Sequence, residues 1–322
     1  MIPSLLTDMP AQLLAWFAAY GRDLPWRHTR DPYQILVAEI MLQQTQVERV
    51  ISKYAAFLAA FPHLEALAAA SVGDVIRHWA GLGYNRRAVN LQRSAKALVE
   101  QYGGQFPREV ALLRQLPGLG PYTAGAVACF AFEQDVVFVD TNMRRVLRRT
   151  HMGADEATTA PPDRELLRLS AALLPAGQGW AWNQALIELG ALRCRAQRPT
   201  CPQCPLQSTC RASAMWRNAD QALLERMEQG QARPTTPLRR AAEGRASYRS
   251  SEPFVGSNRW YRGRIIDLLR DEPAQQAVAL SELGPRLRAD FRPSDMPWLE
   301  ELVAGLARDG LVFLEGGTVR LP

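Results

Sequence analysis

Hydrophobic and polar positions along the 322-residue chain repeat mainly with the period of an α-helix. This pattern predicts helices over residues 1–20, 32–47 and much of 54–105, and a buried helix over 122–132. One short apolar run, Val-Val-Phe-Val at 136–139, has instead the character of a strand. The pattern therefore predicts a chain that is almost entirely helical before residue 213.

A glycine turn, Leu-Pro-Gly-Leu-Gly at 116–120, separates two of these predicted helices. Pro117 cannot continue a helix, and Gly118 and Gly120 let the backbone turn tightly and approach a partner closely. A helix that starts behind such a turn is a ready anion site, because its free N–H groups and its dipole favour a phosphate. By itself a Gly-x-Gly turn is weak evidence, since many such turns bind nothing. We interpret the segment as the hairpin of a helix–hairpin–helix motif.

Two carboxylates occupy unusual positions. Glu39 stands alone in an apolar helical run, where burial would raise the pKa of its carboxyl group into the range that suits a general acid near neutral pH. A glutamate paired with an arginine inside the fold is the structural alternative. Asp140 follows the strand-like run and precedes a helix with four arginines. It is a candidate for chemistry on nucleic acid, or simply the N-cap of that helix.

Four cysteines are crowded into a short loop with the spacing Cys-x6-Cys-x2-Cys-x5-Cys: Cys194, Cys201, Cys204 and Cys210. Four thiolates at this spacing can hold zinc or an iron–sulfur cluster. Such crowding favours a metal site over disulfides in a reducing compartment. Cys129, inside an apolar helical run, is interpreted as a buried structural thiol.

The charge balance points to a polyanionic partner. The net charge is +6, the isoelectric point is near 9.3, and the only lysines are Lys53 and Lys96. The remaining basic residues are arginines, which pair bidentately with phosphates but cannot act as amine nucleophiles. No apolar run of about 20 residues could span a bilayer, and we expect a soluble, cytoplasmic protein associated with the nucleoid.

The pattern changes after the cysteines. Residues 229–258 are polar and rich in proline and glycine, as in a linker, and residues 233–270 hold nine arginines against three acids. Beyond them the sequence predicts a helix over 260–269, a short strand over 278–280, helices over 281–287 and 297–309, and a hairpin around Gly316 and Gly317. This is the element order of a winged-helix domain.

The chain resembles the MutY-type adenine DNA glycosylases of the helix–hairpin–helix superfamily, which also contains endonuclease III. The resemblance covers residues 10–212 and rests on seven motifs: LPWR at 24–27, AEIMLQQTQV at 38–47, GLGY at 81–84, LPGLGPYTAGA at 116–126, VDTN at 139–142, NQALIELGA at 183–191 and the cysteine loop.

This resemblance implies an all-α fold with two lobes and an iron–sulfur cluster loop, to which a small winged-helix-like domain is added. The expected parts are an N-terminal segment of the cluster lobe (1–29), a six-helix barrel with the hairpin (30–137), the catalytic Asp helix with the cluster lobe (138–213), a basic linker (214–258) and the winged-helix-like domain (259–322). The partner would be double-stranded DNA with a mispair or lesion, bound by a monomer with no membrane association.

The resemblance also assigns roles to individual residues. Glu39 would protonate the purine and Asp140 would stabilise the sugar cation, and Tyr122 and Asn142 belong to the same catalytic group. The extruded base would meet Trp26, Arg27 and Gln184. DNA would contact Gln43, Gln44, Tyr84, Gly118 and Gly120, and a [4Fe–4S] cluster would be held by Cys194, Cys201, Cys204 and Cys210.

Three departures keep other functions open. No domain related to Nudix hydrolases, which reads 8-oxoguanine in the family, follows Cys210. Asn85 stands where many members have a second tyrosine, and Thr141 replaces a common glycine. The alternatives are a thymine or uracil mismatch glycosylase of the same superfamily and a catalytically silent, cluster-containing DNA-binding protein. The pair of glutamines before Thr45 favours adenine, and the presence of both Glu39 and Asp140 speaks against the silent protein.

Overall fold

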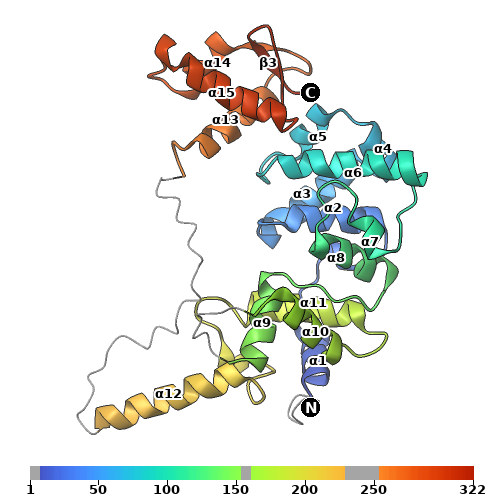
Figure 1. Ribbon diagram of the computed structural model, residues 1–322, viewed down its shortest axis with the longest axis vertical. Helices are drawn as coiled ribbons and strands as arrows, with labels where there is room; N and C mark the ends of the chain where they lie inside the picture. The colour runs from blue at the N-terminus through green and yellow to red at the C-terminus, as the bar shows by residue number, and fades with distance from the viewer. Residues whose placement is uncertain (1–7, 154–160, 229–253) are drawn as a thin grey trace. The chain divides into compact units, whose positions relative to one another are not determined.

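The computed structural model describes residues 8–153, 161–228 and 254–322 (Figure 1). Contacts divide the chain into two compact units, each assembled from separate stretches. One unit comprises Met1–Leu24 and Gly125–Tyr248, and the other comprises Pro25–Ala124 and Arg249–Pro322. None of the described helices is both long and apolar enough to cross a membrane.

The first part of the second unit is a group of helices packed around large buried side chains. Its elements are a 3-10 turn η2 (Pro25–Arg27) and the helices α2 (Pro32–Leu42), α3 (Val47–Ala60), α4 (Leu64–Ala69), α5 (Val72–His78), α6 (Arg86–Tyr102), α7 (Val110–Leu113) and the start of α8 (Pro121–Phe132). Phe57 and Trp79 are fully buried and meet edge to face in its core. Asp31 caps α2 by accepting a 2.9 Å hydrogen bond from the N–H of Tyr33.

Helix α11 (Gly179–Leu192) is the centre of the other unit. Helix α1 (Met9–Tyr20) and helix α9 (Thr141–His151) both pack on it, and α9 also contacts α10 (Asp163–Leu173) and α12 (Arg211–Glu228). The cysteine loop, with its 3-10 turn η3 (Cys201–Gln203), joins α11 to α12. Helix α11 therefore contacts both the N-terminal helix and helix α9, which Asp140 precedes.

The predicted strand before Asp140 is wrong. Residues 133–140 form no helix or strand, although their backbone is ordered by specific contacts. The Asn183 side-chain amide donates a 2.8 Å hydrogen bond to the Val136 carbonyl, and Phe138 packs against Gly125 of α8. A β-carbon at position 125 would lie 2.9 Å from the Phe138 ring. The run is apolar because it is buried against helices, so periodicity alone could not separate it from a strand.

The C-terminal region folds as helix α13 (Asn258–Arg270), strand β1 (Val278–Ala279), helix α14 (Leu280–Leu287), a 3-10 turn η4 (Pro293–Asp295), helix α15 (Met296–Arg308) and strands β2 (Phe313–Glu315) and β3 (Thr318–Arg320). These elements match the sequence prediction closely, except that Leu280 starts a helix. Strand β3 is central in a three-stranded antiparallel sheet, where Val319 pairs with Val278 on one side and Leu314 on the other. Residues 229–253 of the predicted linker lie outside the described residues.

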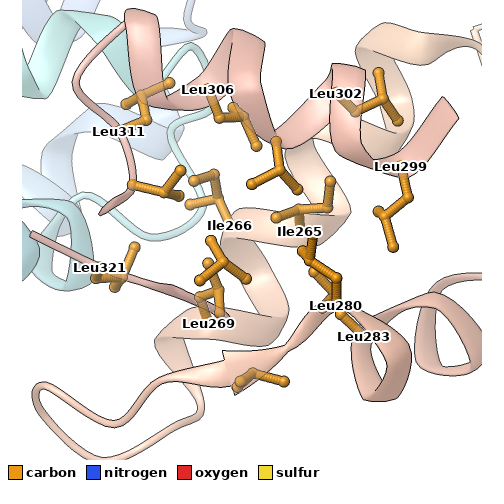
Figure 2. Close-up of a cluster of buried hydrophobic side chains, with 14 of the residues drawn as sticks. Ile265, Ile266, Leu269, Leu280, Leu283, Leu299, Leu302, Leu306, Leu311 and Leu321 are labelled. Atoms are coloured by element: carbon orange, nitrogen blue, oxygen red, sulfur yellow. The ribbon is translucent and has the colours of Figure 1, made fainter. Parts of the chain in front are cut away.

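The apolar core of this region includes side chains from α5 and α6, which belong to the group of helices in residues 25–124 of the same unit, called the barrel below. Figure 2 shows its aliphatic side chains, which come from α13, α14, α15 and the strand segments. Ile76 of α5 and Val89 of α6 belong to the same buried cluster. The Gly73 N–H donates a 2.6 Å hydrogen bond to the Pro322 carbonyl, where a larger residue than glycine would clash. The end of the chain is thus packed onto α5 and α6.

Candidate active site

Glu39 is buried as the sequence predicted. Helix α2 is apolar on nearly every side, and the glutamate, at 5% exposure, lies among buried neighbours from Tyr33 to Met41. A buried carboxyl group in a helix of this kind is retained only for a partner or a function. The helix thus carries one buried acidic residue among apolar residues of the same helix.

Two turns with strained backbones follow this helix and helix α5. Gln44, directly after α2, has φ 55°, and Tyr84, at the end of the Gly-Leu-Gly-Tyr motif, has φ 47°. Side chains with a β-carbon seldom adopt this left-handed conformation, and such strain concentrates at functional sites. Tyr84 is 55% exposed, and Gln43, Gln44 and Tyr84 line one groove. The structure therefore brings together the three side chains predicted to probe the duplex.

Arg87 holds these two turns in place, a role that the sequence did not reveal. Its guanidinium donates hydrogen bonds to carbonyl groups at the end of α2, and to others in the glycine turn; the acceptors are Ile40 (2.9 Å), Met41 (3.0 Å), Gln43, Leu82 (3.0 Å) and Gly83 (3.2 Å). Burial lowers the pKa of Arg87 to about 10, so the group stays charged at neutral pH. The double arginine after Asn85 was its only signal, and Arg86 beside it is mostly exposed.

The hairpin turn has one glycine that the backbone requires and one that it does not. Gly118 has φ 79°, and a β-carbon there would lie 2.7 Å from Asn90. The Ser94 hydroxyl fixes the turn by donating a 2.6 Å hydrogen bond to the Pro117 carbonyl. Gly120 has no positive φ, and a β-carbon added there would meet no atom within 4 Å, so it leaves the start of α8 open to a partner. Gly118 therefore allows the tight turn, and Gly120 leaves room for the close approach that was the other role predicted for the two glycines.

The residues predicted for the base pocket are divided between the two units. Trp26 is buried and meets Tyr54 edge to face, as a residue of the hydrophobic core does. Arg27 beside it is half-buried. Gln184 is buried on α11 in the other unit. Tyr122 is half-buried in the first turn of α8, next to Thr123, whose hydroxyl accepts a 3.2 Å hydrogen bond from the Gln43 side chain.

Asp140 is both a helix cap and a held carboxylate. One oxygen accepts a 2.7 Å hydrogen bond from the Met143 N–H, and the other accepts a 3.1 Å bond from the Asn142 side-chain amide. Desolvation raises the pKa of Asp140, while these donors oppose the rise by stabilising its charged form. The cap alternative and the functional one are therefore compatible, because capping fixes the orientation of the carboxylate.

Arg145 connects this carboxylate to the cysteine loop. Its guanidinium donates to the Asn142 side-chain oxygen (2.7 Å), to the Gly190 carbonyl of α11 (2.7 Å) and to the Cys194 carbonyl (2.5 Å). Gly190 permits this close packing, because a β-carbon there would lie 2.6 Å from that of Asn142. A chain of contacts thus runs from the first cysteine through Arg145 and Asn142 to Asp140.

The four cysteines of the loop line a single cavity, together with Val146, Arg149, Leu189 and Trp216. Burial raises the pKa of the Cys204 thiol to about 12, and the neighbouring thiols add to the rise. Arg149 reaches the Cys194 sulfur at 3.6 Å and donates to the Arg195 and Ala196 carbonyls. Within the described residues, no three acidic, cysteine or histidine side chains form a group that could hold a single metal ion. The sulfurs surround a space instead of meeting at one point.

Glu188 shows how a lone acid in an apolar helix can be structural. It is fully buried on α11, and its carboxylate accepts hydrogen bonds from both the Arg22 side chain (2.7 Å) and the Arg22 backbone N–H (3.0 Å). The pair fixes the segment after α1 against α11. Its position in an apolar run is the same signal as that of Glu39 and could have been noticed in the sequence.

Comparison with known proteins gives the same family from two directions. The HhH-GPD superfamily of base excision DNA repair proteins matches residues 37–171. An adenine DNA glycosylase of Mycolicibacterium smegmatis is 40% identical over 288 residues, covering 87% of this chain and 88% of the relative. That coverage is more than residues 1–213 could supply, so the match extends into the C-terminal part. The adenine DNA glycosylase of Homo sapiens is 44% identical over 64% of this chain and 40% of its own length.

Solved structures agree on the fold. A thermostable thymine-DNA glycosylase is 30% identical and superposes with a TM-score of 0.61, over 66% of this chain and 97% of its own. An endonuclease III in a non-covalent complex with DNA is 23% identical, with a TM-score of 0.59 over 68% and 99%, which supports the fold alone. The chain has a mostly helical, endonuclease III-like fold with a small C-terminal sheet, and it belongs to the adenine DNA glycosylases of the HhH-GPD superfamily of base excision DNA repair proteins.

Proposed function

We propose that this protein hydrolyses the N-glycosidic bond of adenine mispaired with guanine or 8-oxoguanine in double-stranded DNA. The observation that carries the proposal is the arrangement around Asp140, whose carboxylate is oriented by Met143 and Asn142 and backed by Arg145. The relative from Mycolicibacterium smegmatis, named adenine DNA glycosylase and matched over most of its length, supports adenine as the excised base.

The chemistry divides between the two carboxyl groups. A base inside a duplex is out of reach, so the target nucleotide must be extruded at a cost of a few kcal/mol. Protonation of adenine by Glu39 would make the base a better leaving group. The bond then breaks toward an oxocarbenium-like sugar, which the negative charge of Asp140 would stabilise until water adds to the anomeric carbon. Trp26, Arg27 and Gln184 are proposed to receive the base.

Contacts with DNA are proposed for the turns held by Arg87. The strained Gln44 and the exposed Tyr84 are suited to occupy the space that the extruded base leaves. The open start of α8 at Gly120 supports phosphate binding by the hairpin, since free N–H groups at a helix start favour anions.

The cysteine loop is proposed to hold a [4Fe–4S] cluster through Cys194, Cys201, Cys204 and Cys210. Four thiol donors around one cavity fit a multi-iron group, and Arg149 beside the Cys194 sulfur would stabilise a thiolate. When bound, such a cluster would crosslink the loop. Arg145 donates a hydrogen bond to the Cys194 carbonyl of this same loop, so a change in the loop's conformation would alter the positions of Asn142 and Asp140.

We propose that the reaction is hydrolysis only, without strand cleavage through a Schiff base. That chemistry requires an amine that can lose its proton. Lyase-competent members of the superfamily have a lysine in the hairpin motif, and the matching position here is Tyr122. Lys53 on α3 and Lys96 on α6 are the only lysines of the chain, and neither lies in a motif of the site. Borohydride should therefore trap no covalent complex with the wild-type protein.

Excision of thymine or uracil opposite guanine is the second candidate. The thermostable thymine-DNA glycosylase shares the fold at 30% identity, which keeps a pyrimidine substrate open. The C-terminal region is proposed to be a winged-helix-like domain, supported by its helix–strand–helix–helix–hairpin order and its three-stranded sheet.

A panel of duplexes tests the proposal. Adenine, thymine, uracil or guanine is placed opposite guanine or 8-oxoguanine, and base release is scored after alkali treatment. Release of adenine in preference to the other bases supports the proposed function. Release of thymine or uracil alone would transfer the protein to the second candidate, and release of no base would reject both.

A further inference from the structure

A groove of about 770 Å³ runs between the strained turns of the barrel and the C-terminal helices of the same unit. One wall carries Gln43, Gln44 and Tyr84. The other wall is formed by α13, with contributions from the end of α15 and the segment after it. Nothing in the sequence places these two regions beside each other, because about 170 residues separate Tyr84 from α13.

The groove is strongly basic. Six arginines and two aspartates line it, and the arginines come from both walls: Arg49, Arg86, Arg87, Arg259, Arg262 and Arg270. Three of these arginines already have partners within the protein. Arg87 donates to carbonyl groups of the turns, Arg262 pairs with Asp309 at 2.6 Å, and Arg270 pairs with Asp267 at 2.6 Å. Both acids of the groove are thereby neutralised.

Two exposed arginines remain, one on each wall, that form no ion pair in the described part of the chain. Arg49 lies on the barrel wall, and Arg259 lies in the first turn of α13, stacked at 4.9 Å over the ring of Phe254. Arg86 adds a third positive charge, 67% exposed and only loosely paired with Asp309 at 3.5 Å. Unpaired arginines on facing walls fit a phosphodiester backbone, which carries one negative charge per nucleotide.

The α13 wall is also held in place by contacts with the barrel, and it carries no side chain at Gly263. Ile266 of α13 is buried in the apolar cluster that contains Ile76 and Val89 of the barrel, and Arg270 donates to the Ile76 carbonyl at 3.1 Å. Gly263 lies in the middle of the helix, where glycine is less favourable than alanine. A β-carbon there would meet nothing within 4 Å, so the glycine leaves open space on the groove side. Because the wall has no side chain at Gly263, a nucleic-acid backbone can approach the helix closely there.

We propose that α13 is a DNA-contacting element, and that this groove binds the phosphodiester backbone of the duplex that Gln43, Gln44 and Tyr84 probe. The inference rests on the proposed function in taking DNA as the partner. The C-terminal region thereby contributes backbone contacts through Arg259, close passage along Gly263, and a wall whose position is set by the barrel itself.

The test uses the full-length protein and a duplex of about 30 base pairs with a tetrahydrofuran abasic analogue opposite guanine, which cannot be hydrolysed at the site. Fluorescence anisotropy gives Kd at a series of salt concentrations. Arg259→Ala should weaken binding and reduce the slope of log Kd against log salt concentration by about 0.9, the value for one lost phosphate contact. Gly263→Glu, which adds an acid to the wall, should also weaken binding.

Arg264→Ala is the matched control, because Arg264 is equally exposed on α13 but stacks on Trp260 outside the groove. It should leave the affinity and the slope at wild-type values, and thermal melting verifies that all three variants fold. A wild-type slope for Arg259→Ala together with wild-type affinity for Gly263→Glu, or an equal loss in Arg264→Ala, would overturn the proposal. Failure of the wild-type protein to release any base would count against the proposed function alone, since the salt slopes are measured without catalysis.

Discussion

Two arginines, Arg145 in one unit and Arg87 in the other, each hold residues with a proposed role, and they do so with different dependencies. Arg145 fixes Asn142 and through it Asp140, and one of its acceptors is the carbonyl of Cys194. Arg87 fixes the turns of Gln44 and Tyr84, and all its acceptors belong to those turns or to the end of α2.

This difference separates the residue proposed for catalysis, Asp140, from the turns proposed to bind the duplex. The orientation of Asp140, the proposed catalytic carboxylate, depends on the loop whose four cysteines line a cavity. The turns that are proposed to probe the duplex are held, among the described residues, by a side chain of their own unit. Loss of the cysteine loop's structure should therefore affect the rate of base release before it affects recognition of the duplex.

Among the variants that test this comparison, the largest effect is expected for Arg145→Met, which removes the connection between the cysteine loop and Asn142. A small displacement of a catalytic group costs roughly 100-fold in rate, so the single-turnover rate of adenine release should fall by about that factor. Arg144→Met is the control, because it removes the same charge one residue earlier, where the side chain pairs with Asp163 at the surface. Equal rates for the two variants would show that Arg145 does not position Asp140.

A smaller effect on rate, but a clear one on stability, is expected for Arg87→Met. Several carbonyl groups lose their donor at once, and unsatisfied buried polar groups cost about 1–3 kcal/mol each. The melting temperature should fall by several degrees, and the affinity for an abasic-analogue duplex should weaken more than the single-turnover rate at saturating enzyme.

Arg86→Met loses the same charge without any carbonyl contact among the described residues, so its melting temperature should stay at the wild-type value. If Arg87→Met lowered the rate at saturation as much as the affinity, the division between chemistry and binding would fail.

The smallest predicted effect is a shift in pH dependence for Asn142→Ala, which adds to the loss of rate expected when the connection between Arg145 and Asp140 is broken. Asp140 acts in its ionised form, burial raises its pKa, and the Asn142 amide opposes that rise. Without this donor the pKa rises further, so activity is lost at a higher pH as the solution is acidified. The acid limb of the single-turnover profile should therefore move to higher pH. Thr141→Ala, at an exposed neighbouring position, should leave the limb in place, and a downward shift in Asn142→Ala would contradict the role of the amide.

Patterns that depend on local sequence could be predicted, and those that depend on packing between distant segments could not. The helices, the cap at Asp31 and the elements after residue 257 follow from periodicity and turn residues, and the structure has them. Glu39 and Glu188 show the limit: both are lone acids in apolar helices, and the contact between Glu188 and Arg22, which lies 166 residues away in the sequence, forms only in the folded chain. Nothing in either helix distinguishes the two.

The positioning roles of Arg87 and Arg145 could not be predicted from the sequence, for the same physical reason. Arg87 and Arg145 belong to runs of arginines that are also typical of an exposed face, and their neighbours Arg86 and Arg144 are in fact at the surface. A guanidinium finds backbone carbonyls only after the turns have folded around it, so its burial is a consequence of tertiary structure. The apolar run before Asp140 was likewise mistaken for a strand, because burial against helices produces the same composition.

The most direct test of the account is the single-turnover rate of adenine release by Glu39→Gln from a duplex with adenine opposite 8-oxoguanine. Glutamine keeps the size of the side chain but cannot donate the proton to the purine. General acid catalysis contributes about 100-fold to 10,000-fold, so the rate should fall within that range while the variant still binds the duplex. Glu48→Gln, which alters an exposed acid on α3, should release adenine at the wild-type rate. Near-normal release by Glu39→Gln would contradict the account, because the buried carboxyl group would then be structural, as Glu188 is.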